Sequence, residues 1–517
     1  MRDNQSVLLI NPRMCSPAAI RLPLSLLHLA AVLEGRYDYQ LIDGNVDADA
    51  TRTALVALAR EPHALVGVSV MPGPQVGPAI TISTAIRAAY PQVPIAWGGY
   101  FPTMYPDAAI NAPYVDYVVR GQGEHTLLEL LERLPDAGPP PGPLASVTDA
   151  ESVTGLHGLT WKRTGEVQHN PDRHFHPPAA FPRLPYERVG DVRPYLRPSF
   201  MGIRTGVHQG AIGCRYRCEF CGVVTMFNGV TLLPGTSQLV EAMRTLRDRY
   251  GATAMQFYDN NFFDCEETSI PLLDAMGEVQ MPWWCYARAD TLANFSPRTW
   301  ERLRRSQLRM AYIGAEAASD TVLKEMKKGT RVEHTLETAR RCREYGIIPE
   351  FSFVLGGPHD PAGEMAKTFE FIRHLKRLHP ECEVVLYFYS PTPRRQRLTA
   401  HTRETGLRLP VMEQYGPDGP SLPTTPEEWT EPRWLAYVCH QDAPWLTPQI
   451  RQRVKDFATV LGCRFPTVQD YRTPAWGKAT LRHLARWRYS TRRYSNPWEL
   501  KLARRLIPLR EPQQDSL

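Results

Sequence analysis

Residues 213–222 read Gly-Cys-Arg-Tyr-Arg-Cys-Glu-Phe-Cys-Gly and place three cysteines within eight positions. The chain has ten cysteines in 517 residues, and the other seven are scattered singly. That distribution is poor for a disulfide framework and typical of a metal site in a reducing compartment. A cuboidal 4Fe-4S cluster normally has four cysteine ligands, so three would leave one iron open to a non-protein ligand. We therefore predict that Cys214, Cys218 and Cys221 bind a 4Fe-4S cluster.

Two alternatives to a cluster remain open for these cysteines. A structural zinc site would require a fourth Cys or His, and the nearest is His208, which precedes the motif. Three structural cysteines could also lie together by chance. Arg215 and Arg217 place positive charge beside the thiols, which would lower their pKa and favour metal binding.

Outward from the cysteines toward the C-terminus, short apolar runs alternate with helical patterns. A first strand leads from about Gly206 into Cys214, and the next five are predicted at Ala254–Tyr258, Trp283–Ala287, Arg309–Ile313, Pro349–Leu355 and Glu383–Tyr389. Helical patterns fall at Ser237–Tyr250, Ser296–Arg305, Val332–Glu344 and Ala362–Leu378. Six such units are too few for a closed eight-unit barrel and enough for an open, partial (β/α)6 barrel.

The N-terminal part of the chain shows the same alternation. Strands are predicted at Ser6–Asn11, Tyr39–Asp43, Leu65–Ser69, Pro94–Gly98 and Tyr117–Arg120, and helices at Leu22–Glu34, Thr51–Ala59, Pro78–Ala89 and Glu124–Leu134. This pattern predicts an α/β, doubly wound, Rossmann-like domain whose ligands lie at the C-terminal edge of a parallel sheet.

Composition shifts divide the chain into four parts. A proline-rich stretch from Asp136 to Pro143 indicates a linker, and a small hairpin is predicted around Leu159–Val167. We expect a nucleotide-fold domain at 1–135, a linker at 136–200, a barrel at 201–395 and a mainly helical C-terminal region at 396–517. The N-terminus lacks the features of a secretory peptide, and no run of about 18 apolar residues occurs, so a cytoplasmic protein is expected.

The Cys-x3-Cys-x2-Cys spacing, with Phe220 before the last cysteine, resembles the signature of the radical S-adenosylmethionine (SAM) superfamily. It follows the first strand of a six-unit βα series, where that family has it. The resemblance implies that the open iron binds the amino and carboxylate groups of SAM. One electron from the cluster would then cleave a carbon–sulfur bond to give a 5′-deoxyadenosyl radical.

The strand ends of the predicted barrel extend this resemblance, because polar or glycine residues follow each strand where barrel sites are built. The resemblance implies SAM contacts by Phe220, Asp259, Asn260, Arg288, Glu316 and Gly356. Asp-Asn-Asn at 259–261 replaces the Gly-Gly-Glu often found at the second strand, which puts the amino-group contact in doubt. The simpler alternative is that Arg288 and Glu316 form a structural ion pair at the barrel mouth.

The N-terminal domain is similar to the cobalamin-binding domain found in some members of that superfamily. Ser69 and Met71 close the third strand, and Gly98 and Gly99 close the fourth after a spacing typical of that domain; Gly121 lies in a similar segment after the fifth. A small hydroxyl and paired glycines would let a corrin approach the backbone closely. The resemblance therefore implies cobalamin binding by Ser69, Met71, Gly98, Gly99 and Gly121.

One departure concerns the cobalt. The usual Asp-x-His-x-x-Gly after the first strand is missing, and residues 11–16 read Asn-Pro-Arg-Met-Cys-Ser. No histidine is available there to bind cobalt from below. The lower face would then be open or water-bound. The alternative is a domain that keeps the fold without the cofactor.

The C-terminal segment from Lys478 to Arg510 contains ten Lys or Arg and one acid, Glu499. Apolar residues fall on single helical faces: Leu481, Leu484 and Trp487 on one, and Trp498, Leu502 and Leu506 on another. We expect an amphipathic helix pair that packs on the barrel with its charges solvated. Peripheral membrane contact is the main alternative. No RNA-binding module is recognisable, and no nucleic-acid partner is expected.

Together these resemblances imply a cobalamin-dependent radical SAM enzyme, most simply a methyltransferase. Methylcobalamin would give its methyl group to an unactivated carbon of a small-molecule substrate, and flavodoxin or ferredoxin would supply electrons. The alternatives are an oxidative cyclase or rearrangement enzyme that acts on a tetrapyrrole, lipid or natural-product scaffold, and a non-catalytic cobalamin and Fe-S redox sensor. The net charge of +6 is compatible with anionic ligands without implying nucleic acid.

Overall fold

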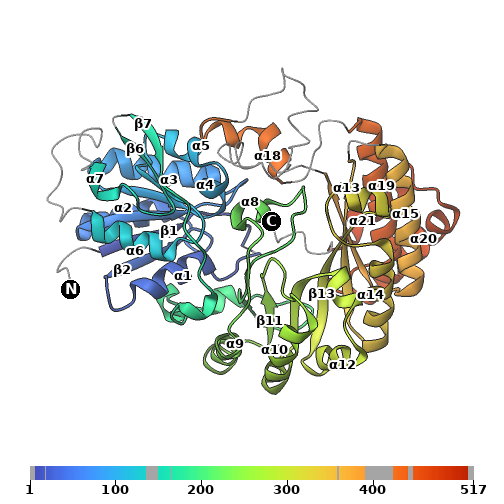
Figure 1. The fold of residues 1–517 in the computed structure, drawn as a ribbon. Coiled ribbons are helices and arrows are strands. Elements are labelled where there is room, and N and C mark those ends of the chain that lie inside the picture. The colour runs from blue at the N-terminus through green and yellow to red at the C-terminus, as the bar shows by residue number, and fades with distance from the viewer. Residues whose placement is uncertain are drawn as a thin grey trace.

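The computed structural model describes residues 6–17, 19–134, 150–163, 165–357, 360–389, 423–439 and 446–510. Two sheets built from alternating strands and helices lie side by side, and helices of the C-terminal region pack beside the second (Figure 1). This arrangement confirms the expected α/β fold class with an open barrel. The predicted linker at Asp136–Pro143 lies outside the described residues.

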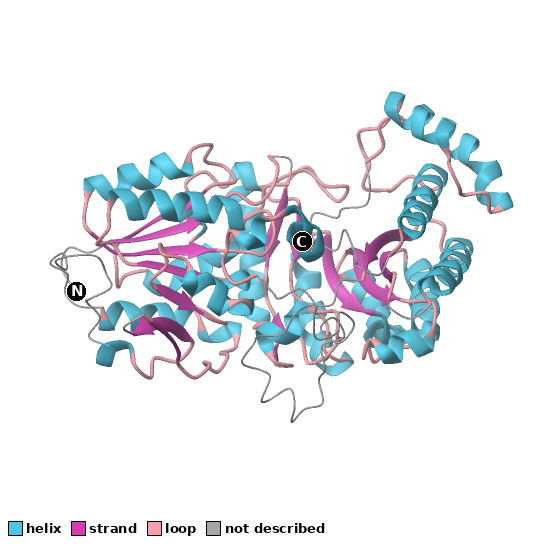
Figure 2. Ribbon diagram, turned by 90° about the horizontal axis from the view of Figure 1, so that it is seen from above, coloured by secondary structure: helices cyan, strands magenta, loops and turns pink. Residues whose placement is uncertain are grey.

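The first sheet has a parallel core of five strands in the order β2-β1-β3-β4-β5. They are β1 Ser6–Asn11, β2 Tyr39–Asp43, β3 His63–Ser69, β4 Ile95–Gly98 and β5 Tyr117–Val119. Helices cover both faces (Figure 2): α1 Leu24–Leu33, α2 Ala50–Arg60, α3 Val76–Ala89 and α6 Glu124–Arg133, with short α4 Tyr100–Met104 and α5 Pro106–Asn111. All six residues of β1 are buried, as expected for a parallel strand covered on both faces.

The predicted hairpin exists and has a role that the sequence did not indicate. Strands β6 Leu159–Arg163 and β7 Glu166–His169 pair antiparallel, and β6 also pairs antiparallel with β5. The segment predicted as a linker at 136–200 therefore completes the first sheet. The physical reason is that β5 would otherwise be an uncovered edge strand with unpaired backbone groups.

The second sheet contains six parallel strands in the order β15-β14-β13-β12-β11-β8. They are β8 Thr205–His208, β11 Ala254–Phe257, β12 Trp283–Arg288, β13 Leu308–Glu316, β14 Ile348–Leu355 and β15 Glu383–Phe388. Around them lie α9 Thr236–Tyr250, α10 Glu266–Val279, α12 Pro297–Arg305, α14 Val332–Tyr345 and α15 Pro361–Leu378, with short α11 Ala289–Ala293 and α13 Asp320–Glu325. Strands β8 and β15 are the two edges, so the barrel is open.

Alternate residues of the barrel strands face two different surroundings. Trp283, Cys285 and Ala287 of β12 belong to the large apolar core that also contains the helix residues Leu272 and Trp300. The residues between them, such as Trp284 and Tyr286, therefore face the interior of the barrel. This alternation brings the side chains of neighbouring strands together inside the barrel.

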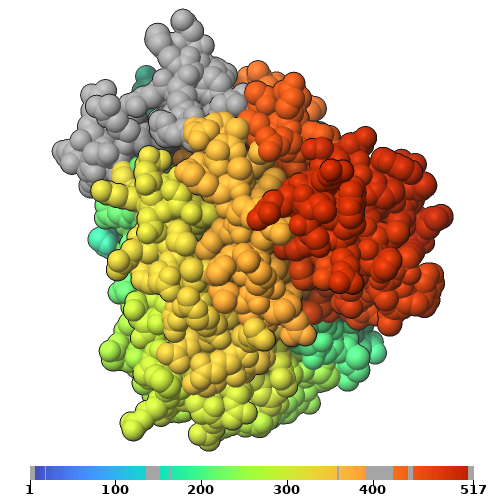
Figure 3. Space-filling model, turned by 90° about the vertical axis from the view of Figure 1, so that its right-hand side faces the viewer, coloured from blue at the N-terminus to red at the C-terminus, as the bar shows by residue number. Residues whose placement is uncertain are grey.

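The C-terminal helices contact both halves of the molecule. They are α18 Pro432–Val438, α19 Pro448–Arg464, α20 Ala475–Thr491 and α21 Trp498–Leu506. Trp429, just before α18, packs edge-on against Phe101 of α4 with ring centroids 6.1 Å apart. Phe457 of α19 stacks on Phe369 of α15 at 3.8 Å. Helices α20 and α21 form a broad face of the molecule (Figure 3). None of the helices in the described ranges is long and apolar enough to cross a membrane.

A segment after α19 closes the lower end of the barrel, where the strands begin. Gln469 donates through Nε2 to Oε1 of Glu350 at 2.8 Å, and Trp284 donates through Nε1 to its Oε2 at 3.4 Å. The neighbouring Glu383 accepts from the Thr467 hydroxyl at 2.9 Å. Glu350 and Glu383 are a cross-strand pair on β14 and β15, and both are buried.

The Glu350 carboxyl gives a prediction about pH. Burial and the nearby Glu383 charge raise the pKa of Glu350 to about 8, so the folded chain holds a proton that the unfolded chain releases. This contribution to stability is complete below the ordinary glutamate pKa and is lost as pH rises through 8. Between pH 6 and 9, the thermal midpoint of the wild type should therefore fall more steeply than that of Glu350→Gln. The difference has an upper limit of about 1.4 kcal/mol per pH unit.

The matched control is Glu325→Gln, because Glu325 is exposed at the end of α13. It should keep the wild-type pH profile of the thermal midpoint. Identical profiles for all three proteins would contradict a proton held on Glu350.

Candidate cluster and cofactor site

The three cysteines share one loop at the upper end of the barrel, where the strands end. The loop runs from the two-residue strand β9 Ile212–Gly213 to the short helix α8 Gly222–Phe227, and β9 pairs antiparallel with β10 Thr231–Leu232. Cys218 is buried, whereas Cys214 and Cys221 are half-buried. The structure therefore brings together the three predicted ligands on a short, closed loop.

Two side chains from the end of β11 hold the start of this loop. Oδ1 of Asp259 accepts from the backbone N–H of Gly210 at 2.9 Å and from that of Ala211. Oδ1 of Asn260 accepts from Gly213 at 3.2 Å. Burial raises the pKa of Asp259 to about 7. Asp259 and Asn260, which were predicted to contact SAM, thus position the backbone that leads into Cys214.

Arg288, at the end of β12, lies against the cysteine loop. Its guanidinium stands over the Tyr216 ring at 3.3 Å from the centroid, and Nη1 is 3.9 Å from Sγ of Cys218. Asp290 accepts from its Nε at 2.9 Å and from Nη2 at 3.1 Å. Arg288 also donates to the Lys328 carbonyl. A buried guanidinium needs such counter-charge, and here it places positive charge beside a thiol.

Glu316, at the end of β13, forms a second buried ion pair. Its Oε1 accepts from Nζ of Lys328 at 2.6 Å and its Oε2 from the Ser352 hydroxyl at 3.2 Å. A β-bulge separates Gly314 from Glu316, whose φ is +60°. A side chain on Gly314 would overlap the carboxylate of Glu316 and the ammonium of Lys328. The glycine is therefore required for this pair.

The alternative of a direct Arg288–Glu316 ion pair is wrong, because each has a different partner. Lys328 was not among the predicted site residues, although it is buried and lies 5.8 Å from the Phe220 ring centroid. Lys328 ends the charged run 324–328, which begins inside α13, and in the sequence it therefore resembles a solvated surface charge. Only the strand-end location of its neighbours could have indicated it.

The pKa shifts of the loop cysteines bear on metal binding, because a metal cluster would replace the protons of their thiols. Burial, followed by the charge of Cys218, raises the pKa of Cys221 to about 12. Burial also raises the pKa of Cys214, against the opposing effect of Arg288 and Lys328. Three thiols that feel one another's charge beside two cations fit a metal cluster that binds thiolates.

A site for a single metal ion has a different requirement, because its ligands must converge on one point. In the described ranges, no three His, Cys, Asp or Glu side chains converge closely enough to hold one metal ion. The irons of a cuboidal cluster lie at separate corners, so the ligands of a cluster are farther apart than the ligands of a single ion.

Gly356, at the end of β14, is covered by another part of the chain. Its φ is +78°, and a side chain there would come within 2.5 Å of Leu446, which precedes α19. Leu446 and Gly356 are both buried. The predicted SAM contact at Gly356 is thus next to a lid from the C-terminal region that the sequence did not indicate.

The predicted cobalamin residues lie together at the C-terminal edge of the first sheet. The Ser69 hydroxyl donates to that of Ser25 on α1 at 3.0 Å, and Gly99, with φ of +95°, packs against Ser69 and Val70. Met71 donates through its N–H to Gln75 at 2.7 Å. Gln75 is buried and joins this loop to the end of β1, a connection that the sequence did not reveal.

Gly121 lies at the same edge. Its N–H donates to the Thr103 hydroxyl at 2.9 Å, and its φ is +73°. Phe175 lies over Gly121 and also contacts Phe227 of α8 with ring centroids 5.3 Å apart. Ser69, Met71, Gly98, Gly99 and Gly121 are thus brought to one edge that faces the cysteine loop. Glycines there expose backbone, which suits a flat ligand such as a corrin.

A direct link between the two edges is Tyr100, the residue after Gly98 and Gly99. A side chain on Gly222 would overlap the Tyr100 hydroxyl and lie 2.7 Å from its Cζ. Burial and the adjacent Cys221 raise the pKa of Tyr100. The residue after the paired glycines therefore touches the residue after the last cysteine.

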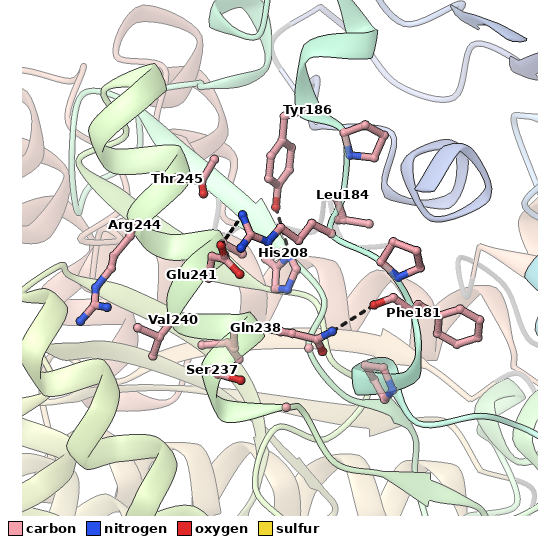
Figure 4. Close-up of a pocket in the computed structure, with 18 of the residues that line it drawn as sticks. Phe181, Leu184, Tyr186, His208, Ser237, Gln238, Val240, Glu241, Arg244 and Thr245 are labelled. Atoms are coloured by element: carbon pink, nitrogen blue, oxygen red, sulfur yellow. Dashed lines mark hydrogen bonds and ion pairs between the residues drawn. The ribbon is translucent and has the colours of Figure 1, made fainter. Parts of the chain in front are cut away.

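A pocket of about 840 Å³ lies elsewhere, outside the barrel wall (Figure 4). Segment 178–187 and helix α9 form its sides, joined by the ion pair of Arg183 with Glu241 at 2.6 Å. Tyr186 and His208, 3.3 Å apart, lie at its base. The pocket contains none of the predicted cluster, SAM or cobalamin residues.

Two family models match the chain. The B12 binding domain model matches residues 17–131, and the Radical SAM superfamily model matches residues 211–372. The first range contains the edge with Ser69 and Gly99, and the second contains all three loop cysteines. Two parallel-sheet units, one matching each model, thus meet at their C-terminal edges.

The chain is also similar in sequence to proteins named as methyltransferases. The chain is 23% identical over 358 residues, 68% of its length and 73% of the relative, to an uncharacterized methyltransferase, PH0819, of Pyrococcus horikoshii. It is 26% identical over 412 residues, 69% of its length and 74% of the relative, to a cytidylyl-2-hydroxyethylphosphonate methyltransferase of Streptomyces wedmorensis.

A solved structure confirms the fold. The radical SAM methyltransferase TsrM from Kitasatospora setae, with cobalamin and a [4Fe-4S] cluster bound, has a TM-score of 0.63 and 19% identity, covering 97% of this chain and 99% of that one. The fold and the site define a radical SAM enzyme with a second, nucleotide-fold domain. The chain therefore contains one segment that matches the B12 binding domain and another that matches the Radical SAM superfamily.

The contact between Tyr100 and Gly222 gives a prediction. Gly222→Ala should displace Tyr100, lowering the thermal midpoint and the iron bound after anaerobic reconstitution. In Gly222→Ala/Tyr100→Ala the new methyl group has room, so the double variant should recover iron binding relative to Gly222→Ala alone. A non-additive cycle of this kind is expected of residues in direct contact.

The matched control is Gly277→Ala, because a side chain at Gly277 in α10 would meet only ordinary contacts. It should bind iron as the wild type does. Additive effects of the two substitutions in the cycle would contradict the contact.

Proposed function

We propose that this enzyme is a methyltransferase that transfers a methyl group from methylcobalamin to a carbon of a small-molecule substrate. The observation that carries the proposal is the contact of Tyr100 with Gly222, because it joins the edge that fits the corrin to the loop that fits the cluster. A methyl carrier and a radical generator must both reach one substrate carbon. Two methyltransferase relatives that align with more than two thirds of the chain support it.

When bound, the cluster, SAM and methylcobalamin would supply a 5′-deoxyadenosyl radical and a methyl group. Cys214, Cys218 and Cys221 would hold the cluster, and Asp259 and Asn260 would fix the loop through its backbone. Arg288 and Lys328 balance the negative charge of the thiolates. Burial of these groups excludes water, which protects a radical from side reactions.

The remaining site residues divide by location. Phe220, Arg288, Glu316 and Gly356 lie around the barrel mouth and would border SAM. Ser69, Met71, Gly98, Gly99 and Gly121 would border cobalamin. Gln75 donates to Asn11 and Pro12 where β1 ends, and the loop that follows contains no histidine, so this loop would offer cobalamin no imidazole ligand.

An oxidative cyclase or rearrangement enzyme would use the same cofactors and yield an unmethylated product. A redox sensor would make no product. Six strands with a complete set of polar strand ends are more than a sensor needs, so an enzyme is favoured. Product analysis distinguishes these three functions.

The electron would come from an acidic carrier such as flavodoxin or ferredoxin. Arg215 and Arg217 are exposed on the cysteine loop. Their positive charge would attract a negatively charged protein to the side of the molecule nearest the cluster. A radical SAM enzyme needs such a donor because the cluster must be reduced from outside.

The C-terminal face supports a second proposal, contact with an anionic membrane surface. Trp476, Trp487 and Trp498 are 66%, 56% and 63% exposed, and Leu506 is 80% exposed. The prediction that the two apolar faces pack on the barrel is wrong for most of their residues, because Leu481 is buried with α19 whereas the exposed residues are Leu484, Trp487, Trp498, Leu502 and Leu506. Helices α20 and α21 and the residues beside them thus present apolar side chains to solvent.

Positive charge surrounds these apolar side chains. The exposed cations on α20 and α21 include Arg482, Arg486, Lys501 and Arg505. Tryptophans and leucines among Lys and Arg are typical of helices that lie in the interface of an anionic bilayer. This surface would bring a lipid-soluble substrate or product close to the enzyme.

The cysteine assignment is tested with Cys218→Ala. After anaerobic reconstitution and reduction, this variant should bind less iron and release 5′-deoxyadenosine from SAM only at background level, because the cluster loses a ligand. Iron content and mass spectrometry of the nucleoside measure both. The control is Cys265→Ala, a half-buried cysteine outside the loop, which should keep both properties.

Methyl transfer is measured in the same preparations with SAM carrying a deuterated methyl group. A product that gains the labelled methyl only when hydroxocobalamin is added supports the methyltransferase. An oxidised product without the label would indicate the cyclase. SAM cleavage by Cys218→Ala at the wild-type rate would overturn the radical function.

The membrane proposal is tested by sedimentation with vesicles. Wild-type protein should bind vesicles of phosphatidylcholine with phosphatidylglycerol, bind pure phosphatidylcholine weakly and dissociate at high salt. Trp498→Ser/Leu506→Ser should bind less. Ile203→Ser, which removes an exposed apolar residue far from this face in the sequence, is the control. Equal binding by the double variant would contradict the proposal.

A further inference from the structure

The interior of the barrel is lined by aromatic side chains. Four strands contribute them: Tyr258 just after β11, Trp284 and Tyr286 on β12, Tyr312 on β13 and Tyr387 on β15. The residues that alternate with Trp284, Tyr286, Tyr312 and Tyr387 belong to the apolar core, so these four point inward. Tyr258 also packs against that core, but Phe257 pairs with Cys285, so Tyr258 follows in register with Tyr286 and lies on the same side of the sheet. No part of the site described above assigns them a role.

The aromatic rings form one connected wall. Ring centroids are 4.6 Å apart for Trp284 and Tyr286, 5.1 Å for Tyr286 and Tyr312, and 6.0 Å for Tyr258 and Trp284. The first two pairs are edge-to-face, and the Tyr312 hydroxyl donates to that of Tyr387 at 3.1 Å. These contacts orient the rings, and an aromatic ligand would be recognised by the same edge and face contacts.

The exposure of these side chains indicates space beside them. Tyr258, Tyr286, Tyr312 and Tyr387 are only half-buried although they face the barrel interior, whereas Trp284 is buried at the lower end. Below Trp284, the Glu350 and Gln469 contact closes the barrel. A ligand that contacts the tyrosines therefore cannot enter past Trp284, and the upper end, where the cysteine loop lies, and the open side between β8 and β15 are the remaining approaches.

The charged groups around the wall are already paired. Both carboxylate oxygens of Glu316 accept hydrogen bonds, from Lys328 and Ser352, and Arg288 is paired with Asp290. The Glu350 carboxylate accepts from Gln469 and Trp284. What the wall offers a ligand is therefore mainly aromatic surface. Such a surface selects flat rings over saturated or highly charged molecules.

We infer that the substrate presents a planar aromatic ring system to the barrel, bound by edge and face contacts with Tyr258, Tyr286 and Tyr312. This inference rests on the proposed function, since it takes the barrel mouth as the place where the radical meets its substrate. Tyr286 is two residues before Arg288 on β12, so the wall begins next to the cysteine loop. The ring would then lie close enough to that loop for its carbon atoms to react.

The test uses two probes of the same carbon skeleton, 2-naphthol and decahydro-2-naphthol. Their binding to the anaerobically reconstituted holoenzyme is measured by ligand-observed NMR. We expect 2-naphthol to bind more tightly, by roughly three- to tenfold, the value of an aromatic contact beyond its buried area. Equal binding of the two probes, or preference for the saturated one, overturns the inference without any variant.

Variants of the barrel tyrosines test where 2-naphthol binds. Tyr286→Leu and, on another strand, Tyr258→Leu should each remove the preference for 2-naphthol, whereas Tyr471→Leu, at an exposed tyrosine, should keep it. A preference unchanged in both barrel variants overturns the site. Cleavage of SAM is recorded in the same samples. If SAM is not cleaved but the preference for 2-naphthol is retained, the proposed function is contradicted and the aromatic site is not.

Discussion

The two buried cations beside the cysteine loop, Arg288 and Lys328, constrain the structure around them. A buried cation is tolerated only where a counter-charge meets it, and Asp290 and Glu316 supply that charge. The Glu316 pair needs a bulge in β13 and a glycine at 314, because any side chain there would occupy the space of the ion pair. The ends of β12 and β13 must also lie side by side, as neighbouring parallel strands do.

A second consequence of parallel strands is that both halves of the molecule offer their ligand edges to each other. The first sheet ends in glycine-containing turns after β4 and β5, and the barrel ends in the cysteine loop. Tyr100 occupies the boundary and needs Gly222 opposite it. The segments that match the B12 binding domain and the Radical SAM superfamily share this chain, and their junction consists of small residues and aromatic rings.

Much of the fold could be predicted from the sequence because strands buried on both faces appear as apolar runs, and glycines or polar residues follow them. Helix α10 was missed because Pro271 interrupts its pattern. The partner of β5 was missed because antiparallel addition from a segment expected to be a linker has no local signal. The cysteine loop was evident from spacing alone. Lys328, Tyr100 and Gln75 were not, since their roles depend on contacts between segments distant in the chain.

The closed lower end of the barrel has a consequence for synthesis of the chain. Glu350 and Glu383 become neighbours as soon as β14 and β15 pair, but Gln469 and Thr467 leave the ribosome only after the residues that follow β15 have been made. Until then, the nascent barrel has two adjacent carboxylates open to water at its base and cannot bury them. The barrel therefore closes its lower end late, after its strands are in place, and a nascent chain that does not yet include Gln469 has a base that is open to water.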